Sequence, residues 1–459
     1  MKNSINNNNK IELLAPAGLP RQSKKKAKVE LLAPAGSLEK MKYAFAYGAD
    51  AVYFGVPDFS LRVRVNKFSE QDILKAVSYA HKLKKKIYVT LNIYAHNQHL
   101  KKIEKHLKFL KKIKIDGIIA SDPGIINLVK KYLPNVDIHL STQANATNFE
   151  AVKFWRDLGV KRIILAREVT LKEIEEISKK VKGIELEYFV HGAMCMSYSG
   201  RCILSKWMNG KSANLGDCTQ PCRWEYKTMI KDQESMINKF KKLKIKDEKD
   251  RYEMDIEEDR HGTYFFNSYD MNLISYMEEL VSAGISSMKI EGRAKSVYYV
   301  AVVTRAYRKV IDAIIETHCN ASVRKKIILE QKKELDNLVH RGYSTGFLLG
   351  QEPAHNFSGK LFGTKVEFVG EVRGVEGKLN IMKIHNAVLR QDKIEAITPE
   401  KNIALKIKKI FNDQKKEIDE AHGGHKKLYY FEFDKVLPEG GLIRRKIVLR
   451  NTKCLKILK

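Results

Sequence analysis

The chain has 459 residues, of which 44% are hydrophobic and 30% are charged. This length corresponds to two to four ordinary domains, or to one large barrel with an additional module, and the composition excludes a disordered or collagen-like chain. Lysine and arginine outnumber aspartate and glutamate by 84 to 54, so the formal net charge is +30. A charge of this sign favours a polyanionic partner, nucleic acid before membrane.

The two ends of the chain are especially basic. Residues 1–28 contain seven basic residues and one acidic residue, and residues 444–459 contain seven basic residues and no acidic one. A lysine-rich, solubilising surface explains the bulk of the charge equally well, but it explains the acid-free C-terminal run less well. The polar start has no signal-peptide character, and no apolar run reaches the ~18 residues that span a bilayer. We therefore expect a cytoplasmic protein without membrane contact, with a basic, flexible tail over 1–28.

A short repeat marks where the folded part begins. IELLAPAG at 11–18 recurs as VELLAPAG at 29–36, and only the second copy precedes a helical pattern. From there, short apolar runs alternate with stretches of helical periodicity. The runs span 30–33, 51–55, 87–92, 117–121, 137–141, 162–166, 185–190 and 286–291.

The spacing of these runs predicts the fold. Apart from the last interval, they start about 20–36 residues apart, which is the length of a βα unit. Eight such units predict an α/β fold, a parallel (β/α)8 TIM-like barrel over 29–350. A doubly wound open sheet is the alternative, and it is weakened because no G-x-G-x-x-G follows any run.

The remaining segments differ from the barrel region in composition and periodicity. Before the eighth run lies a charged tract over 231–260, with nine basic and ten acidic residues, for which we predict a disordered insertion. After that run two long helices are expected, the first ending near 316 and the second over about 323–340. From about 356 to 459, short β-like runs with glycine punctuation predict a small β-barrel-like C-terminal domain that carries the basic tail.

A cluster of four cysteines is the sharpest chemical signal. It reads Cys195-x6-Cys202-x15-Cys218-x3-Cys222 and holds four of the six cysteines of the chain. In a cytoplasmic protein this grouping indicates a metal site more than disulfides. The paired C-x2-C knuckles of structural zinc are absent, and four thiolates suit an iron–sulfur cluster at least as well. Iron–sulfur and zinc both stay open, and unligated buried cysteines are the third interpretation.

Polar residues gather at the predicted strand ends, on the face where barrel enzymes carry out their chemistry. The cysteine cluster follows the seventh run and so lies on this face. Arg167 and Arg293 are suited to clamp a small anionic ligand. Any one of these residues is more typical of a loop or a salt bridge, so the assignment concerns the set. We assign catalytic or pocket-shaping roles to His191, Glu291, Arg293 and Arg167, and substrate contacts to Asn92, Gln143, Asn145 and Arg445.

The sequence resembles the U32 family, which is named for peptidases, along nearly the whole chain from about residue 29. The stretches that carry the resemblance include ELLAPAG, AFAYGADAVYFG, SLRVRVNKF, HLSTQANATN, FVHGAMCMSYSGRC, CRWEY, SMKIEGRAKSVYY and HRGYSTGF. Within the family the chain is most similar to a bacterial branch that takes part in forming 5-hydroxyuridine at the wobble position of tRNA.

The resemblance implies a barrel with a small C-terminal β domain and a [4Fe-4S] cluster on Cys195, Cys202, Cys218 and Cys222. It also implies prephenate, a small anionic metabolite, as co-substrate, and the tRNA anticodon stem-loop as partner. The expected activity is hydroxylation of wobble uridine 34 to 5-hydroxyuridine. The alternatives are a collagenase-like U32 peptidase using Cys195 and His191, a hydroxylase of another RNA position such as ribosomal RNA, and a non-catalytic RNA-binding scaffold with zinc.

Overall fold

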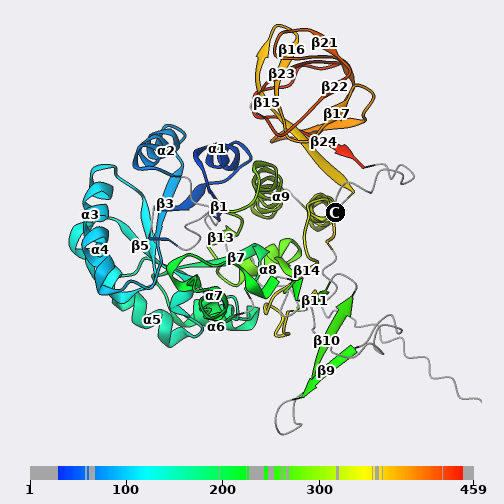
Figure 1. Ribbon diagram of the computed structural model, residues 1–459. Helices are drawn as coiled ribbons and strands as arrows, with labels where there is room; N and C mark the ends of the chain where they lie inside the picture. Colours follow the sequence, from blue (N-terminus) through cyan, green and yellow to red (C-terminus); the bar gives the residue numbers. More distant parts are fainter. Residues whose placement is uncertain are drawn as a thin grey trace, which may run out of the picture.

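The structure is a computed structural model. It describes residues 29–56, 59–60, 68–195, 197–223, 225–226, 242–246, 253–259, 262–264, 268–316, 320–353, 355–356, 361–363, 365–425 and 427–447. The tail predicted over 1–28 and the end of the basic C-terminal run, after residue 447, lie outside these residues. Figure 1 shows a barrel surrounded by helices and a separate β domain beside it.

Eight parallel strands form the barrel. They are β1 (Glu30–Pro34), β2 (Ala51–Gly55), β3 (Lys86–Leu91), β4 (Gly117–Ala120), β5 (Asp137–Leu140), β6 (Arg162–Ile164), β7 (Glu185–Ala193) and β13 (Ser287–Ile290). Each pairs with the next, and β13 pairs with both β7 and β1, which closes the cylinder. Every predicted run overlaps one of these strands, so the (β/α)8 barrel is confirmed and the open sheet is wrong.

Helices cover the outside of the barrel because each strand is apolar on both faces and needs cover. They are α1 (Leu38–Ala46), α2 (Glu70–Lys82), α3 (Asn97–Lys112), α4 (Pro123–Tyr132), α5 (Phe149–Asp157), α6 (Leu171–Lys180), α8 (Met277–Ser282), α9 (Val297–Ile315) and α10 (Ala321–Asp336). Side chains such as Ser37, Asp122 and Ser296 cap the first turns and fix where helices begin. None of the described helices combines the length and apolar character needed to cross a membrane.

A long insertion separates β7 from β13. It contains η3 (Tyr198–Gly200), α7 (Leu204–Asn209), η4 (Ala213–Leu215), η5 (Pro221–Arg223), β8 (Glu225–Tyr226), β9 (Lys242–Lys246), β10 (Glu253–Asp259), β11 (Gly262–Tyr264), β12 (Asp270–Asn272) and η7 (Ile274–Tyr276). β12 pairs antiparallel with β7 and parallel with β14 (Tyr343–Ser344), so the end of the insertion returns to the barrel. A further short helix, η2 (Thr142–Ala144), follows β5.

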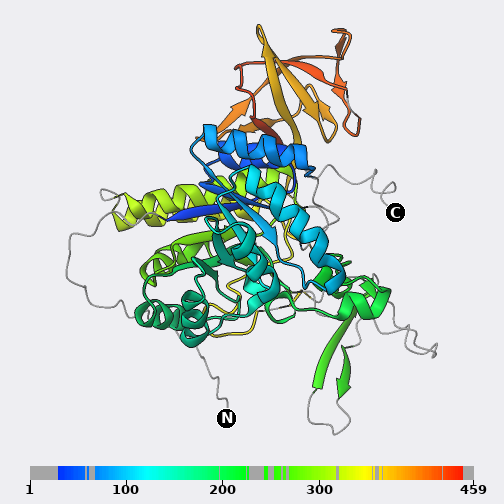
Figure 2. The ribbon, with the colours of Figure 1, turned by 90° about the vertical axis from the view of Figure 1, so that its left-hand side faces the viewer.

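Within the charged tract over 231–260, for which we predicted a disordered insertion, the structure describes two strands at 242–246 and 253–259, and the rest of the tract lies outside the described residues. β9 and β10 run antiparallel, with Lys242, Lys244 and Lys246 in register with Glu257, Asp255 and Glu253. In Figures 1 and 2 the β9–β10 pair projects away from the barrel, on the side opposite the C-terminal domain.

The C-terminal domain is entirely β, as predicted. Its strands are β15 (Val366–Glu376), β16 (Leu379–Ile384), β17 (Val388–Leu389), β18 (Ile394–Ile397), β19 (Asn402–Leu405), β20 (Ile407–Phe411), β21 (Glu417–Ile418), β22 (Glu420–Ala421), β23 (Tyr429–Phe433) and β24 (Leu442–Lys446). Eight of them form one antiparallel sheet, and β17 pairs with β22. The sheet encloses its own apolar core, which includes Val372, Met382 and Phe431.

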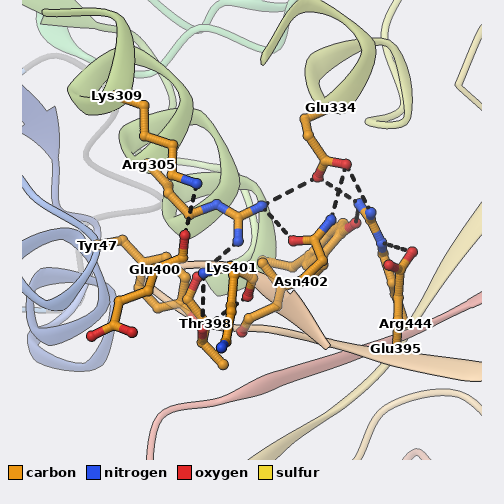
Figure 3. Close-up of polar contacts among 12 residues, drawn as sticks. Tyr47, Arg305, Lys309, Glu334, Glu395, Thr398, Glu400, Lys401, Asn402 and Arg444 are labelled. Carbon is orange, nitrogen blue, oxygen red and sulfur yellow. Dashed lines mark hydrogen bonds and ion pairs between the residues drawn. The ribbon is translucent and has the colours of Figure 1, made fainter. Parts of the chain in front are cut away.

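Buried polar contacts join the two domains (Figure 3). Arg305 on α9 donates to Thr398 O (2.7 Å) and to Asn402 Oδ1 (2.8 Å). Arg444 on β24 donates to Glu334 on α10, with an Nη2–Oε1 distance of 3.0 Å, and to Glu395. Ile397 and Leu442 of the β domain belong to the apolar core of the barrel. The interface is therefore continuous with the barrel interior.

Candidate active site at the mouth of the barrel

A cavity of about 160 Å³ lies at the C-terminal ends of the barrel strands. The barrel supplies one wall and the first part of the insertion, residues 194–223, supplies the other. A comparable cavity of about 150 Å³ holds one benzene molecule. The space is therefore large enough for a group of ring size.

All four predicted cysteines line this cavity. None of the four forms a disulfide with another described residue, and each is only partly exposed. Burial raises the pKa of the Cys222 thiol to about 11, and the neighbouring thiols of Cys195, Cys218 and Cys202 act in the same direction while Arg223 opposes them. The four sulfurs are thus close enough to interact electrostatically, although they come from separate turns of the insertion.

Four thiols are a donor set that both iron–sulfur clusters and zinc ions use. Within the described residues, no group of three or more His, Cys, Asp or Glu side chains is arranged to hold one metal ion. A zinc ion would bring its sulfurs within roughly 4 Å of one another, given Zn–S bonds of about 2.3 Å in a tetrahedron. A four-iron cluster places its cysteines on different iron atoms, so the sulfurs lie farther apart. Ligation of either metal stays a prediction.

Residues 194–223, which we call the cysteine segment, are anchored to the barrel through Ser199. The backbone N–H of Ser199 donates to Glu168 Oε1 (2.7 Å), and its hydroxyl donates to Asn145 Oδ1 (2.6 Å). Both Ser199 (φ 49°) and Asn145 (φ 59°) adopt the left-handed conformation, which costs free energy and persists where surrounding contacts enforce it. Arg201 adds a bond from its Nε to Gln143 O (2.9 Å). These contacts fix the thiols relative to the strand ends.

The floor of the cavity is cationic. Lys289 on β13 is buried, and its Nζ lies 2.7 Å from Glu187 Oε1 and 4.4 Å from the centre of the Tyr53 ring. Burial lowers the pKa of Lys289, and the Glu187 carboxylate opposes this shift. The Arg167 guanidinium lies 4.1 Å from the centre of the Phe189 ring. Two aromatic faces thus hold two cations at the base of the cavity.

The chain just after β13 contributes a third cationic side chain. Arg293 lines the cavity, and its Nη1 lies 3.4 Å from Thr90 Oγ1. Gly55 makes room for it, because a Cβ at that position would lie 1.7 Å from Ser60 Oγ and 3.3 Å from Arg293 Nη1. Glu291 is the acidic residue of this wall. The wall therefore carries more positive than negative charge.

Two buried hydrogen-bond donors at the cavity have no partner within the described part of the chain. They are Gln143 Nε2 and Arg167 Nε. Gln143 Oε1 is already used, because it accepts from Asn92 Nδ2 at 2.9 Å. An unsatisfied buried donor is costly, so both groups favour a ligand rich in acceptor oxygens. This is the geometric support for a small anionic ligand.

The structure brings most of the predicted site residues together. Those in the cavity wall are Asn92, Gln143, Arg167, Cys195, Cys202, Cys218, Cys222, Glu291 and Arg293. Asn145 lies behind the wall, where it holds Ser199. His191 and Arg445 are not in the wall.

His191 points away from the cavity. Its ring is 1% exposed and lies among Tyr299, Tyr307 and Tyr343, and the Tyr307 hydroxyl is 3.3 Å from its Nδ1. Burial lowers the pKa of His191 to about 3, so the imidazole is neutral. A pocket-shaping role was predicted for His191. Its placement does not match that role, because β7 directs the side chain outward, between the barrel and helix α9.

Arg445 lies on β24 of the C-terminal domain and serves that domain. It donates to Glu367 Oε2 (2.6 Å) and to Asp392 Oδ2 (2.6 Å). The neighbouring Arg444 is buried at the domain interface. The predicted substrate contact of Arg445 is therefore not supported, since both carboxylates already engage its guanidinium.

Sequence reasoning missed Lys289, Arg223 and the two aromatic residues of the floor. A usable signal existed for Lys289, because a lone lysine inside a buried apolar strand is rare unless it is paired or functional. Arg223 follows Cys222 directly, and its Nη2 donates to Met194 O (3.1 Å). Nothing in the sequence pattern distinguishes it from a surface arginine.

Comparison with known proteins identifies relatives along the whole chain. The model of peptidase family U32 matches residues 36–357, and that of the U32 C-terminal domain matches residues 364–444. The tRNA hydroxylation protein P of Haemophilus influenzae is 40% identical over 475 aligned positions, which cover 97% of this chain and 98% of that protein. The 23S rRNA 5-hydroxycytidine C2501 synthase of Escherichia coli is 36% identical over 60% of this chain and 38% of its own length. A collagenase of Porphyromonas gingivalis is 31% identical, with 75% of each chain covered.

Proposed function

Since this chain belongs to peptidase family U32, we propose that it is an RNA hydroxylase that converts wobble uridine 34 of tRNA to 5-hydroxyuridine. One observation carries the proposal: four thiols and three cationic side chains share a cavity of ring size at the barrel mouth. The similarity to tRNA hydroxylation protein P over both domains supports the choice of tRNA. The rRNA hydroxycytidine synthase among the relatives keeps another RNA position as the alternative substrate.

In this proposal Cys195, Cys202, Cys218 and Cys222 hold a [4Fe-4S] cluster, which supplies redox chemistry when bound. The residues of the chain supply the rest. The Ser199 anchor holds the thiols against the strand ends. The cysteine segment also closes one side of the cavity, so it limits the access of water to the reacting groups.

The cationic floor is proposed to bind prephenate, or another small anionic metabolite, as co-substrate. Arg167 offers a guanidinium with an unpartnered Nε, and Lys289 and Arg293 lie in the same wall. Charge-assisted bonds to carboxylates are the strongest hydrogen bonds in proteins. Replacing the C5 hydrogen of uracil by a hydroxyl group is a two-electron oxidation, so a co-reactant is required in addition to the RNA.

The net charge of +30 supports binding of the tRNA backbone. The base to be modified must leave its stack to reach the cavity, which an anticodon loop allows at modest cost.

The peptidase alternative is less well supported by the geometry. Cys195 Sγ lies 3.0 Å from Ser197 Oγ, whereas His191 contacts Tyr307 behind the wall. A thiol protease needs its base within hydrogen-bond reach of the nucleophile.

Nucleoside mass spectrometry tests the proposal. A strain lacking the gene, and lacking any redundant hydroxylase, is expected to lose 5-hydroxyuridine and its derivatives from tRNA, and the intact gene is expected to restore them. A gene carrying Cys202→Ala is expected not to restore these nucleosides. A gene carrying Cys454→Ala, which lies outside the cysteine cluster in the sequence, is expected to restore them. Unchanged tRNA in the deletion strain rules out this substrate. Zinc at one equivalent and no visible absorption in anaerobically purified protein would contradict the cluster.

A further inference from the structure

Two large exposed apolar side chains are direct sequence neighbours of cavity-lining residues. Tyr198 is 56% exposed and directly precedes the wall residues Ser199 and Gly200. Ile203 is 75% exposed and lies between the wall residues Cys202 and Leu204. Isolated exposed apolar residues are ordinary, but these two flank residues that line the cavity which a target base has to enter.

The backbone around Tyr198 is held in place. Ser199 is 3% exposed, adopts a left-handed conformation, and is bound by Glu168 and Asn145. The anchored Ser199 is buried while its neighbour Tyr198 is exposed, so a backbone held in place presents the Tyr198 ring to solvent. A rigid, outward aromatic ring loses little conformational entropy when a partner packs against it.

The charge around the rim is suited to RNA. Residues 194–223 contain four basic residues and one acidic residue. Arg201, Lys206 and Lys211 are exposed. The acidic groups nearest Tyr198 are Glu168, which accepts from Ser199, and Glu173, which accepts from Thr170 and caps α6. Both carboxylates are thus engaged within the protein, while three cations face solvent.

We propose that Tyr198 and Ile203 form a stacking surface for the unpaired RNA bases that flank the target base. This inference rests on the proposed function and adds the element that holds the substrate. When one base leaves the stack, its neighbours expose their faces, and aromatic or apolar side chains cover such faces irrespective of sequence. The cysteine segment then has two roles, because its inner side lines the cavity and its outer side holds the loop.

Binding of a fluorescently labelled tRNA anticodon stem-loop to the full-length, anaerobically purified protein tests this. Tyr198→Ala combined with Ile203→Ala is expected to weaken binding by about 5- to 100-fold, the range for loss of a base–ring stack. Tyr198→Phe is expected to bind like the wild type. The slope of log affinity against log salt is expected to stay unchanged, because no charge is removed. Phe154→Ala is the matched control, since Phe154 on α5 is 58% exposed but outside the cavity wall.

Iron content and visible absorption of each variant establish that the cysteine segment is intact. If Tyr198→Ala loses iron, Tyr198→Gln replaces it, because glutamine keeps part of the bulk but offers neither an aromatic nor an apolar face. Binding within twofold of wild type by the double variant overturns the inference. The proposed function fails separately, when the wild-type gene does not restore 5-hydroxyuridine in the deletion strain. Restoration by wild type and double variant alike, at equal rates, overturns only the stacking surface.

Discussion

Lys289 shows how one buried charge organises the floor of the cavity. Its ammonium group is bound by Glu187, which also accepts from Arg162 Nη1 (3.2 Å) and Ser287 Oγ (3.2 Å). This chain of contacts ties the cavity to the ion pairs at the opposite end of the barrel. Removing Lys289 would therefore take one of three partners from the buried Glu187 carboxylate and leave Arg162 and Ser287 in place.

We predict that Lys289→Met lowers the free energy of unfolding by about 1.5–3 kcal/mol, because Glu187 loses one charge-assisted bond but keeps Arg162 and Ser287, and that it abolishes tRNA hydroxylation. The double variant Lys289→Met with Glu187→Gln is expected to regain part of the stability, since a neutral amide needs no cation in place of Lys289, but not the activity. Chemical denaturation and tRNA nucleoside analysis measure the two effects. Wild-type activity in the double variant would show that Lys289 is structural only.

Gly192 sits where β7 leads into the cysteine segment. Its φ is +110°, and a Cβ there would lie 2.5 Å from the carbonyl oxygen of Glu291. Gly183 also has a positive φ, +77°, but a Cβ there meets nothing within 4 Å. Comparing an alanine substitution at Gly192 with one at Gly183 therefore distinguishes the effect of a steric clash from that of backbone strain alone.

We predict that Gly192→Ala displaces both the cysteine segment and Glu291 and lowers the iron content of the purified protein. Gly183→Ala is expected to cost only the left-handed strain of about 1–2 kcal/mol and to keep its iron. Iron analysis and thermal unfolding of both variants check this. Equal iron in the two variants would contradict the steric role of Gly192.

At the scale of elements, α1 meets β15 through a buried carboxylate. Glu371 accepts from the Tyr43 hydroxyl (2.8 Å), and Arg373, Lys383 and His385 also lie within 3.3 Å of its oxygens. Burial alone would raise the pKa of Glu371, but the bonds from His385, Tyr43 and Arg373 outweigh it and lower the pKa to about 2. The carboxylate is therefore charged throughout the neutral range.

We predict a corresponding pH dependence of stability. The pKa in the folded state lies below the ordinary value of 4.5, so this stabilisation is complete above about pH 4.5 and is lost as pH falls towards 2. Its size is at most about 3 kcal/mol. Glu371→Gln is expected to be less stable than wild type at pH 7 and to lose less stability between pH 5 and 3, as measured by urea unfolding. Parallel pH profiles of the two proteins would contradict this role.

The elements that sequence patterns predicted are those governed by local periodicity. The run at 117–121 became β4 and the helix expected to end near 316 became α9, because burial on both faces leaves an unambiguous apolar pattern. The cysteines were placed correctly at the mouth since the position of a loop follows from its strand. The orientation of His191 was not predictable, because the pairing of β7 with β13 shifts register between Phe189 and His191. Such an irregularity breaks the alternation that would otherwise place both side chains on one face.

At the scale of the whole molecule, the two domains share a buried interface. Arg444 crosses it, since its guanidinium reaches Glu334 on α10 and the Tyr298 hydroxyl on α9 (3.2 Å). The next residue, Arg445, binds only carboxylates of the C-terminal domain itself. Two adjacent arginines on one strand therefore perform different tasks, which basic character alone does not reveal.

Because Arg444 and Arg445 have different partners, we predict that their loss affects unfolding differently. Arg444→Met is expected to remove the contacts of β24 with Glu334 and Tyr298, while Glu334 keeps Arg305 on α9 and Asn402 across the interface. The loss is expected to cost about 1.5–3 kcal/mol and to split one cooperative unfolding transition into two as the domains uncouple. Arg445→Met is expected to weaken the C-terminal domain without splitting the transition, because its pairs do not cross the interface. Differential scanning calorimetry distinguishes the two. Neither variant is expected to change the slope of log affinity for tRNA against log salt concentration, since each guanidinium is neutralised by carboxylates rather than by phosphates. If Arg445→Met instead reduced this slope by about one unit, Arg445 would be an RNA contact after all.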